Sequence, residues 1–184
     1  MSNNLELNQL TKQSLKTALI QLLKDNEVEQ ISVTSLTHRA GVSRMAYYRN
    51  YQSITHLYHD VYDEYFQQFF HENRSLLVQR NGFNFWKNLF SFLYRHQDVA
   101  EILLSPKENH HFLAYLNEAF CQPLNDLHDR YLMRGVIGSI FNILVQWVND
   151  EFVYEPEILA ELCQQLTQNV PAPIANLDKW LPDN

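Results

Sequence analysis

The chain of 184 residues contains only 4 glycines and 6 prolines, and 46% of its residues are hydrophobic. So few glycines argue against a β-sandwich, a glycine-rich phosphate loop and a Rossmann unit, and the apolar content excludes a disordered chain. Residues 1–60 hold six Lys and Arg against five Asp and Glu, whereas the remaining residues hold eight against sixteen. The mildly basic N-terminal part is therefore the part suited to a polyanionic partner.

Helical periodicity runs through the chain, and it predicts an all-α protein of about nine helices. Thr11 is expected to cap the first helix, which stops at residues 25–26. Two short helices are expected at about 33–39 and 44–50, and Ser53 is expected to cap a long fourth helix. Further helices are expected at about 83–96, 98–104, 107–120 with a continuation toward 128, 131–149 and 155–169.

The fourth helix carries one continuous apolar stripe, whose members recur at i, i+3, i+4 and i+7. The stripe is about 25 Å long at 1.5 Å per residue, so it can pack on an N-terminal unit at one end and a C-terminal unit at the other. Its members are Ile54, Leu57, Tyr58, Val61, Tyr62, Tyr65, Phe66, Phe69 and Phe70.

The segment 32–51, SVTSLTHRAGVSRMAYYRNY, has the features of a helix-turn-helix. Two short helices that cross sharply need a residue that tolerates a positive φ between them, and Gly41 supplies it. Ser43 is expected to cap the second helix. The small core beneath is expected to contain Leu36, Val42 and Tyr47.

The second short helix would project Arg44, Met45, Tyr48 and Arg49 away from that core. Such a helix suits the major groove, with its first residues near the base edges. Arg44 is the best candidate to read a guanine, and Arg49 and the Tyr48 hydroxyl suit phosphates. Hydroxyls at the start of the first short helix offer another phosphate site, at Ser32, Thr34 and Ser35.

The stretch 11–62 resembles the DNA-binding domain of the TetR family of bacterial transcriptional regulators. The resemblance implies an all-α homodimer whose first three helices bind DNA and whose fourth helix leads into a regulatory body. It also implies a phosphate contact by Tyr48 and groove contacts by Arg44, Met45 and Tyr47. The residues that carry it are Val33-Thr34-Ser35-Leu36, Ala40-Gly41-Val42-Ser43, Ala46-Tyr47-Tyr48-Arg49-Asn50-Tyr51, and Ser53 with Leu57. The candidate DNA-binding residues are therefore Ser32, Thr34, Ser35, Ser43, Arg44, Met45, Tyr47, Tyr48 and Arg49.

The expected domains are a DNA-binding domain at 8–70, an effector-binding and dimerisation domain at 71–170, and an irregular tail at 171–184. The middle domain resembles the C-terminal domain of the subgroup around the dihydroxyacetone-kinase regulator. The aromatic segment 83–94 and the segment from Phe141 to Trp147-Val148, which acidic residues follow, carry this second resemblance.

Two positions depart from the family pattern. Ile54 stands where many relatives have a Lys, and Ala46 stands where Thr is frequent. Each missing cationic phosphate contact lowers the counterion-release slope by about 0.9. We therefore expect weaker operator binding, loss of DNA binding, or compensation by Lys12, Lys16 or His56.

The 131–149 helix is apolar on nearly all sides, which leaves two interpretations: the central helix of a monomer, or a helix shared between its own core and a symmetry mate. The resemblance favours the second, because the last two long helices of such proteins form the dimer interface. The predicted interface residues are Val136, Ile140, Leu144, Trp147, Leu159, Leu162 and Leu166.

The aromatic residues of the body either form a packed core or line a small-molecule pocket. The predicted function is a ligand-responsive repressor that binds a palindromic operator as a homodimer. The alternative is a protein-binding adaptor, or a coactivator-dependent regulator, whose body binds a partner protein. Candidate pocket residues are Phe66, Phe69, Phe90, Tyr94, Phe112, Tyr115 and Phe141.

No metal site, cofactor or catalytic activity is expected. Two histidine pairs, at 56/59 and 110/111, lack the further ligands of a four-coordinate site. A nucleophile elbow, an HExxH motif and a phosphate loop are missing from the sequence, which disfavours an enzyme. Cys121 and Cys163 suit buried thiols in a reducing cytoplasm, and polar residues interrupt the most apolar stretch, 131–148, so no membrane partner is expected.

Overall fold

A computed structural model describes residues 2–79, 82–122 and 124–167 of the chain. These residues form nine α-helices and one short 3-10 helix, with no β-strand among them, which confirms the all-α prediction. The tail predicted at 171–184 lies outside the described residues. The chain divides into two compact units, Met1–Tyr65 and Phe66–Asn184.

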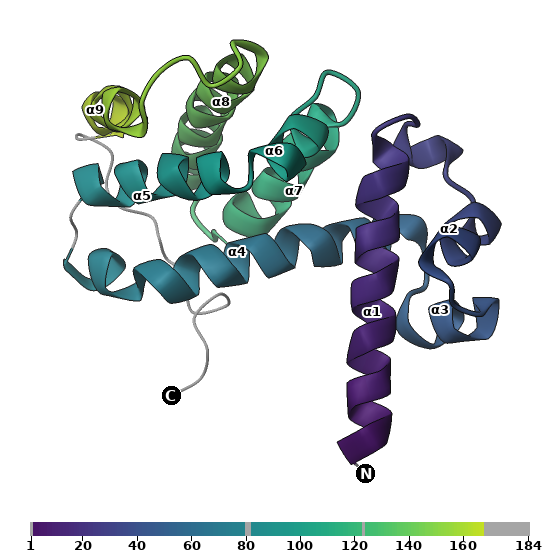
Figure 1. Ribbon diagram of the computed structural model, residues 1–184. Helices are drawn as coiled ribbons and strands as arrows, with labels where there is room; N and C mark the ends of the chain where they lie inside the picture. Colours follow the sequence, from purple (N-terminus) through teal and green to yellow (C-terminus); the bar gives the residue numbers. More distant parts are fainter. Residues whose placement is uncertain (1, 80–81, 123, 168–184) are drawn as a thin grey trace. The chain divides into compact units, whose positions relative to one another are not determined.

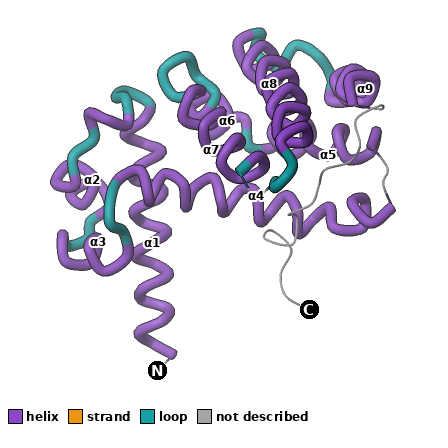
Figure 2. The backbone as a smooth tube through the Cα atoms, turned by 180° about the vertical axis from the view of Figure 1, so that it is seen from behind, coloured by secondary structure: helices purple, strands orange, loops and turns teal. Residues whose placement is uncertain are grey.

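The first unit contains α1 (Ser2–Leu23), a 3-10 helix (Val28–Gln30), α2 (Val33–Ala40), α3 (Arg44–Asn50) and the start of α4 (Ile54–Gln79). Figures 1 and 2 both show α2 and α3 next to each other beside α1, and α1 contacts both. Helices as short as α2 and α3 are marginal alone, so tertiary packing must hold them. The core that does so contains Leu15, Leu19, Leu36, Tyr47, Leu57, Tyr58 and Tyr62.

The start of α1 differs from the prediction. The helix begins at Ser2, and Thr11 lies in its interior, where its Oγ1 donates a hydrogen bond to the carbonyl of Leu7 at 2.9 Å. A Thr hydroxyl in the middle of a helix can donate to the carbonyl four residues earlier, so it does not need a capping position for its hydrogen bond. The cap predicted at the next long helix is confirmed, because the His56 N–H donates to Ser53 Oγ at 3.0 Å.

The predicted apolar stripe of α4 is confirmed. Six of its nine residues are buried, and Ile54, Tyr65 and Phe66 are half-buried. One continuous helix therefore supplies core side chains to both units, with the boundary falling after Tyr65.

The second unit contains the rest of α4, with α5 (Gly82–Arg95), α6 (Gln97–Leu103), α7 (Asn109–Cys121), α8 (Leu127–Asn149) and α9 (Pro156–Thr167). Helix α9 packs mainly on α5, and α7 packs on α8 (Figure 1). The main core cluster includes Phe90, Leu104, Leu116, Met133, Ile137, Phe141, Leu144, Trp147 and Cys163.

The predicted extension of the 107–120 helix toward 128 is wrong. Helix α7 ends at Cys121, and α8 starts at Leu127, four residues before the predicted start. Asp126 is the N-cap of α8, since its side chain accepts a hydrogen bond from the Asp129 N–H at 3.0 Å. A carboxylate at a helix N-terminus also interacts favourably with the helix dipole.

One helix of the described residues, α8, is long and apolar enough to cross a bilayer, with a mean hydropathy of 1.3 over its best window. A core helix passes the same test. Seven of its side chains, among them Phe141 and Trp147, are buried within the second unit.

A buried polar pair joins α4 to α5. The Asn88 Nδ2 donates to Asn73 Oδ1 at 2.6 Å, and the Asn73 Nδ2 donates to the Phe69 carbonyl at 2.8 Å. Asn73 is buried, so these bonds offset the desolvation cost of its amide.

Both cysteines are buried free thiols, in agreement with the sequence-based prediction. Burial raises the pKa of the Cys163 thiol to about 12. A thiol that stays protonated at neutral pH is a poor nucleophile, so Cys163 acts as a small apolar core residue.

Candidate nucleic-acid interface

Gly41 forms the turn between α2 and α3 with a φ of +65°. Its N–H donates to the His38 carbonyl, and the Val42 N–H donates to the Thr37 carbonyl at 3.1 Å, which closes the end of α2. A Cβ at this position would meet no atom within 4 Å. The turn therefore requires glycine for its left-handed backbone and not for space, as predicted.

Serine side chains fix the starts of both short helices. The Ala46 N–H donates to Ser43 Oγ at 3.1 Å, which confirms the predicted cap of α3. Ser32 and Ser35 form a reciprocal capping box, in which the Ser35 N–H donates to Ser32 Oγ at 3.0 Å and the Ser32 N–H donates to Ser35 Oγ at 3.2 Å. These three hydroxyl oxygens are therefore used to position α2 and α3.

Eight of the nine candidate DNA-binding residues are exposed: Ser32, Thr34, Ser35, Ser43, Arg44, Met45, Tyr48 and Arg49. Tyr47 is the exception, because its ring has no exposed surface. It lies in the core beneath α3, as the packing argument predicted, and its ring lies 5.2 Å from that of Tyr48. We therefore remove Tyr47 from the set of proposed groove contacts.

The charged side chains of the segment 30–59 are all basic. The sequence has no Asp or Glu between Glu29 and Asp60, although the whole chain holds 21. The same segment carries three exposed arginines, Arg39, Arg44 and Arg49. The sequence-based set omitted Arg39, although the acid-free run itself could have identified it. A segment with exposed arginines and no carboxylates of its own attracts polyanions despite the net charge of −7 of the whole chain.

A polar network holds the C-terminal end of α3. The Tyr51 hydroxyl donates to Asp60 Oδ2 at 2.5 Å, and Lys16 Nζ lies 3.2 Å from the same oxygen and 2.8 Å from Glu64 Oε2. Tyr51 is the C-cap residue of α3, so the network ties α3 to α1 and α4. Lys16, one of the residues expected to compensate for Ile54, therefore already pairs with two carboxylates.

The network separates the pKa values of its two central groups. Burial would raise the pKa of the Asp60 carboxyl, but the Tyr51 hydrogen bond and the charge of Lys16 outweigh burial, so the net shift is downward. Burial, followed by the hydrogen bond to Asp60, raises the pKa of the Tyr51 phenol. The charge therefore stays on Asp60 and the proton on Tyr51.

This arrangement predicts that the stability of the first unit falls in acid. A lowered folded-state pKa means that Asp60 stabilises the fold fully above the ordinary pKa of an aspartate and less as the pH falls through the folded value. At neutral pH we expect Asp60→Asn to lower the free energy of unfolding by about 1–2 kcal/mol. Chemical denaturation at neutral pH and at about pH 2–3 measures the difference in the free energy of unfolding between the wild-type chain and Asp60→Asn. This difference should disappear at the lower pH. A difference that is unchanged between the two pH values would contradict the assignment.

Several candidate pocket residues lie at one core: Phe90 and Phe141 belong to the main core cluster, and Phe66 and Phe112 pack against it. Phe66 contacts Phe112 and Tyr115, with ring centroids 6.2 and 5.6 Å apart, and Phe112 contacts Phe141 at 6.4 Å. Among the other candidates, Phe69 contacts Phe85 and Phe92, and Phe90 and Tyr94 contact Trp147.

The predicted interface residues also divide. Ile140, Leu144, Trp147 and Leu159 are buried in the core of the chain itself, and Val136 is half-buried against that core. Leu162 and Leu166 are exposed, and Ile158 lies on the same flank of α9, four residues before Leu162. Residues that are already buried have little area left to lose on association. The exposed flank of α9 is therefore the part of the predicted interface that remains open to a partner.

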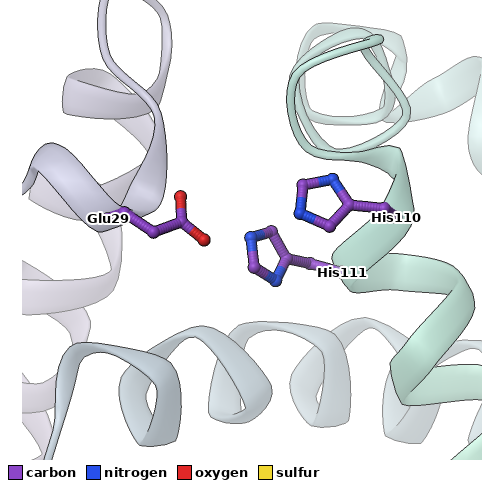
Figure 3. Close-up of side chains that lie close together, drawn as sticks. All are labelled: Glu29, His110 and His111. Atoms are coloured by element: carbon purple, nitrogen blue, oxygen red, sulfur yellow. The ribbon is translucent and has the colours of Figure 1, made fainter.

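His110 and His111 lie next to each other at the start of α7, as Figure 3 shows. Their ring centroids are 4.0 Å apart. Glu29, the third side chain in that view, belongs to the first unit. Two imidazoles provide at most two of the four ligands of a structural zinc site, so this pair by itself supports no metal centre.

No protein-family model and no curated protein matches the sequence. Several solved structures match most of the chain, among them the following three. The fatty acid degradation regulator FadR from Bacillus halodurans is 17% identical, with a TM-score of 0.59, over 88% of this chain and 96% of its own. NalD, the secondary repressor of the MexAB-OprM multidrug efflux pump in Pseudomonas aeruginosa, is 18% identical, with a TM-score of 0.60, over 87% and 95%. The dihydroxyacetone kinase operon activator DhaS is 20% identical, with a TM-score of 0.53, over 86% and 94%. At these identities the likeness shows a shared fold.

Proposed function

We propose that this chain, whose fold is that of the TetR-type regulators, is a cytoplasmic transcriptional regulator that binds double-stranded DNA. The observation that carries the proposal is the acid-free segment 30–59, which contains α2 and α3 and exposes Arg39, Arg44 and Arg49. Enzymatic activity forms no part of the proposal.

In the proposed complex α3 lies in the major groove. Its first residues reach the base edges, with Arg44 forming a bidentate pair with a guanine. Tyr48, which is 57% exposed, and Arg49 bind phosphates. Thr34 supplies a further hydroxyl at the start of α2.

Two substitutions separate base reading from backbone binding. Sequences selected from a randomised duplex pool give the operator, and affinities are then measured on it and on single-base variants. Arg44→Ala should reduce discrimination at one G·C position by about 5- to 150-fold, because a bidentate pair contributes about 1–3 kcal/mol. Tyr48→Phe should weaken all sequences alike by about 5-fold, as expected for one neutral hydrogen bond.

The affinities of these two variants and of the wild-type chain can contradict the proposal in two ways. Equal losses on every sequence for both variants would contradict the roles given to Arg44 and Tyr48. A wild-type chain that selects no sequence and binds no duplex at low salt would contradict the proposed function itself.

We propose that the functional form is a homodimer that pairs through the exposed flank of α9. Ile158, Leu162 and Leu166 recur at i, i+4 and i+8, so they form one apolar flank of α9, next to the buried side that contains Leu159 and Cys163. A two-fold dimer presents two α3 helices to half-sites about one helical turn apart, which requires a palindromic operator.

We further propose that the regulator is a repressor that a small apolar effector releases. The support is the aromatic group of Phe66, Phe112, Tyr115 and Phe141, which a ligand with an apolar body could enter by displacing ring contacts. A coupling free energy of about 1–3 kcal/mol would change operator affinity 5- to 150-fold. Among the proteins of similar fold, NalD is a repressor and DhaS an activator, so a reporter assay with the operator decides the sign.

A further inference from the structure

Met45 is a large apolar side chain on the outer side of α3. It is 75% exposed, and the cationic side chains of Arg44 and Arg49 are exposed on the same short helix. Tyr48 is the other large exposed hydrophobic residue of α2 and α3, and its hydroxyl gives it a polar function. Single exposed apolar residues are common on protein surfaces, but on a helix that is proposed to enter the major groove such a residue can meet an apolar group of the DNA.

The buried ring of Tyr47 fixes which way α3 faces. Successive residues of a helix are about 100° apart, so Met45 and Arg49, two residues before and after Tyr47, each lie about 160° from it. They are therefore the two side chains that point most directly away from the core. Met45 is the one of these two that lies in the first turn of α3, where a helix in the major groove reaches the base edges.

We propose that Met45 recognises a thymine by contact with its C5-methyl group. This inference rests on the proposed function, because it requires α3 to enter the major groove. Thymine is the one base that presents an apolar group there, whereas the other bases present only donors and acceptors. The Met side chain has no donor, and its flexible, polarizable thioether adapts to a methyl partner. Opposite a polar base edge, Met45 would bury donors or acceptors without satisfying them.

The proposal predicts that a single methyl group on the DNA determines part of the specificity. After selection of the operator, each thymine is replaced in turn by uracil, which keeps the same hydrogen-bonding groups and lacks the methyl. For the wild-type chain, we expect one sensitive thymine in each half-site. Its replacement in one half-site should weaken binding about 4-fold, as expected for one buried methyl group. For Met45→Ala, the same replacement should have little effect, because the contact is already lost.

Two controls make the result specific. Arg49→Ala removes the neighbouring outward side chain and should weaken all sequences while keeping the preference of thymine over uracil. At the same position, cytosine should bind less well than thymine, and 5-methylcytosine should recover part of the loss relative to cytosine because it restores the methyl.

The outcomes distinguish this inference from the function on which it rests. Selective operator binding by the wild-type chain with no effect of uracil at any position overturns the role of Met45 and leaves the regulator proposal standing. The same holds if Met45→Ala keeps the full preference of thymine over uracil. Failure of the wild-type chain to select any sequence overturns the proposed function instead.

Discussion

Tyr47→Ala should unfold the first unit, Met1–Tyr65, and abolish operator binding. The ring is fully buried beneath α3 and contacts the rings of Tyr48 and Tyr51. Truncation of a buried aromatic residue costs about 3–5 kcal/mol, which is a large fraction of the stability of a small unit. Chemical denaturation of the full chain should show a separate transition of low stability, while the second unit keeps its own transition.

Two matched variants test whether this is a core effect. The Tyr47 hydroxyl has no hydrogen-bond partner among the described residues, so Tyr47→Phe should preserve operator affinity and keep or raise the free energy of unfolding, by up to about 1 kcal/mol. Tyr48→Ala removes the exposed neighbour and should change stability by less than about 0.5 kcal/mol while weakening DNA binding. A loss of affinity in Tyr47→Phe at unchanged stability would restore Tyr47 as a DNA contact.

Leu162→Glu should convert the proposed dimer into monomers. Each leucine that leaves an apolar interface costs about 1.5–3 kcal/mol, and the substitution occurs in both copies, so the dimer should weaken at least about 100-fold. Operator affinity should fall when the dimer dissociates, because each monomer then binds a single half-site. Sedimentation equilibrium over a range of concentrations measures the first effect, and binding to full and half operators measures the second.

Gln164→Glu is the control, since it adds the same charge to the opposite exposed flank of α9 and should leave the dimer intact. Ionic strength provides an independent test. Residues 135–167 contain five Asp and Glu and no Lys or Arg, and one of the five, Glu157, forms an ion pair with Lys87 of α5. The remaining acidic charge should make two copies that meet here repel each other, so added salt should tighten the dimer by screening. An unchanged association constant for Leu162→Glu would remove the α9 flank from the interface.

The local signals of the helix-turn-helix could be predicted from the sequence because each rests on a single residue. Gly41 is needed for a left-handed turn, and Ser43 and Ser53 each accept a hydrogen bond from an N–H three residues later. The start of α1 could not be predicted in the same way. Thr11 looks like a cap in a polar segment, but its hydroxyl is equally well satisfied by the Leu7 carbonyl inside a helix.

The division of the apolar residues between core and interface could not be predicted from periodicity. In the sequence Leu159 and Leu162 are equivalent leucines on one helix, yet Leu159 is buried against the body and Leu162 is exposed. Which flank is covered depends on where α5 and α8 lie, and that is a property of the fold. Which aromatic side chains contact one another could not be predicted from periodicity either, since Phe66 and Phe90 contact different rings in the folded chain. The pocket itself stays a prediction.

The amide pair of Asn73 and Asn88 limits how α4 can move. Sliding α4 along α5 by one helical turn, about 5.4 Å, would separate the two amides and leave the Asn73 oxygen without its donor in an apolar environment. The amide pair therefore opposes a one-turn shift of α4 against α5 by about 1–3 kcal/mol, and it holds the register between these two helices.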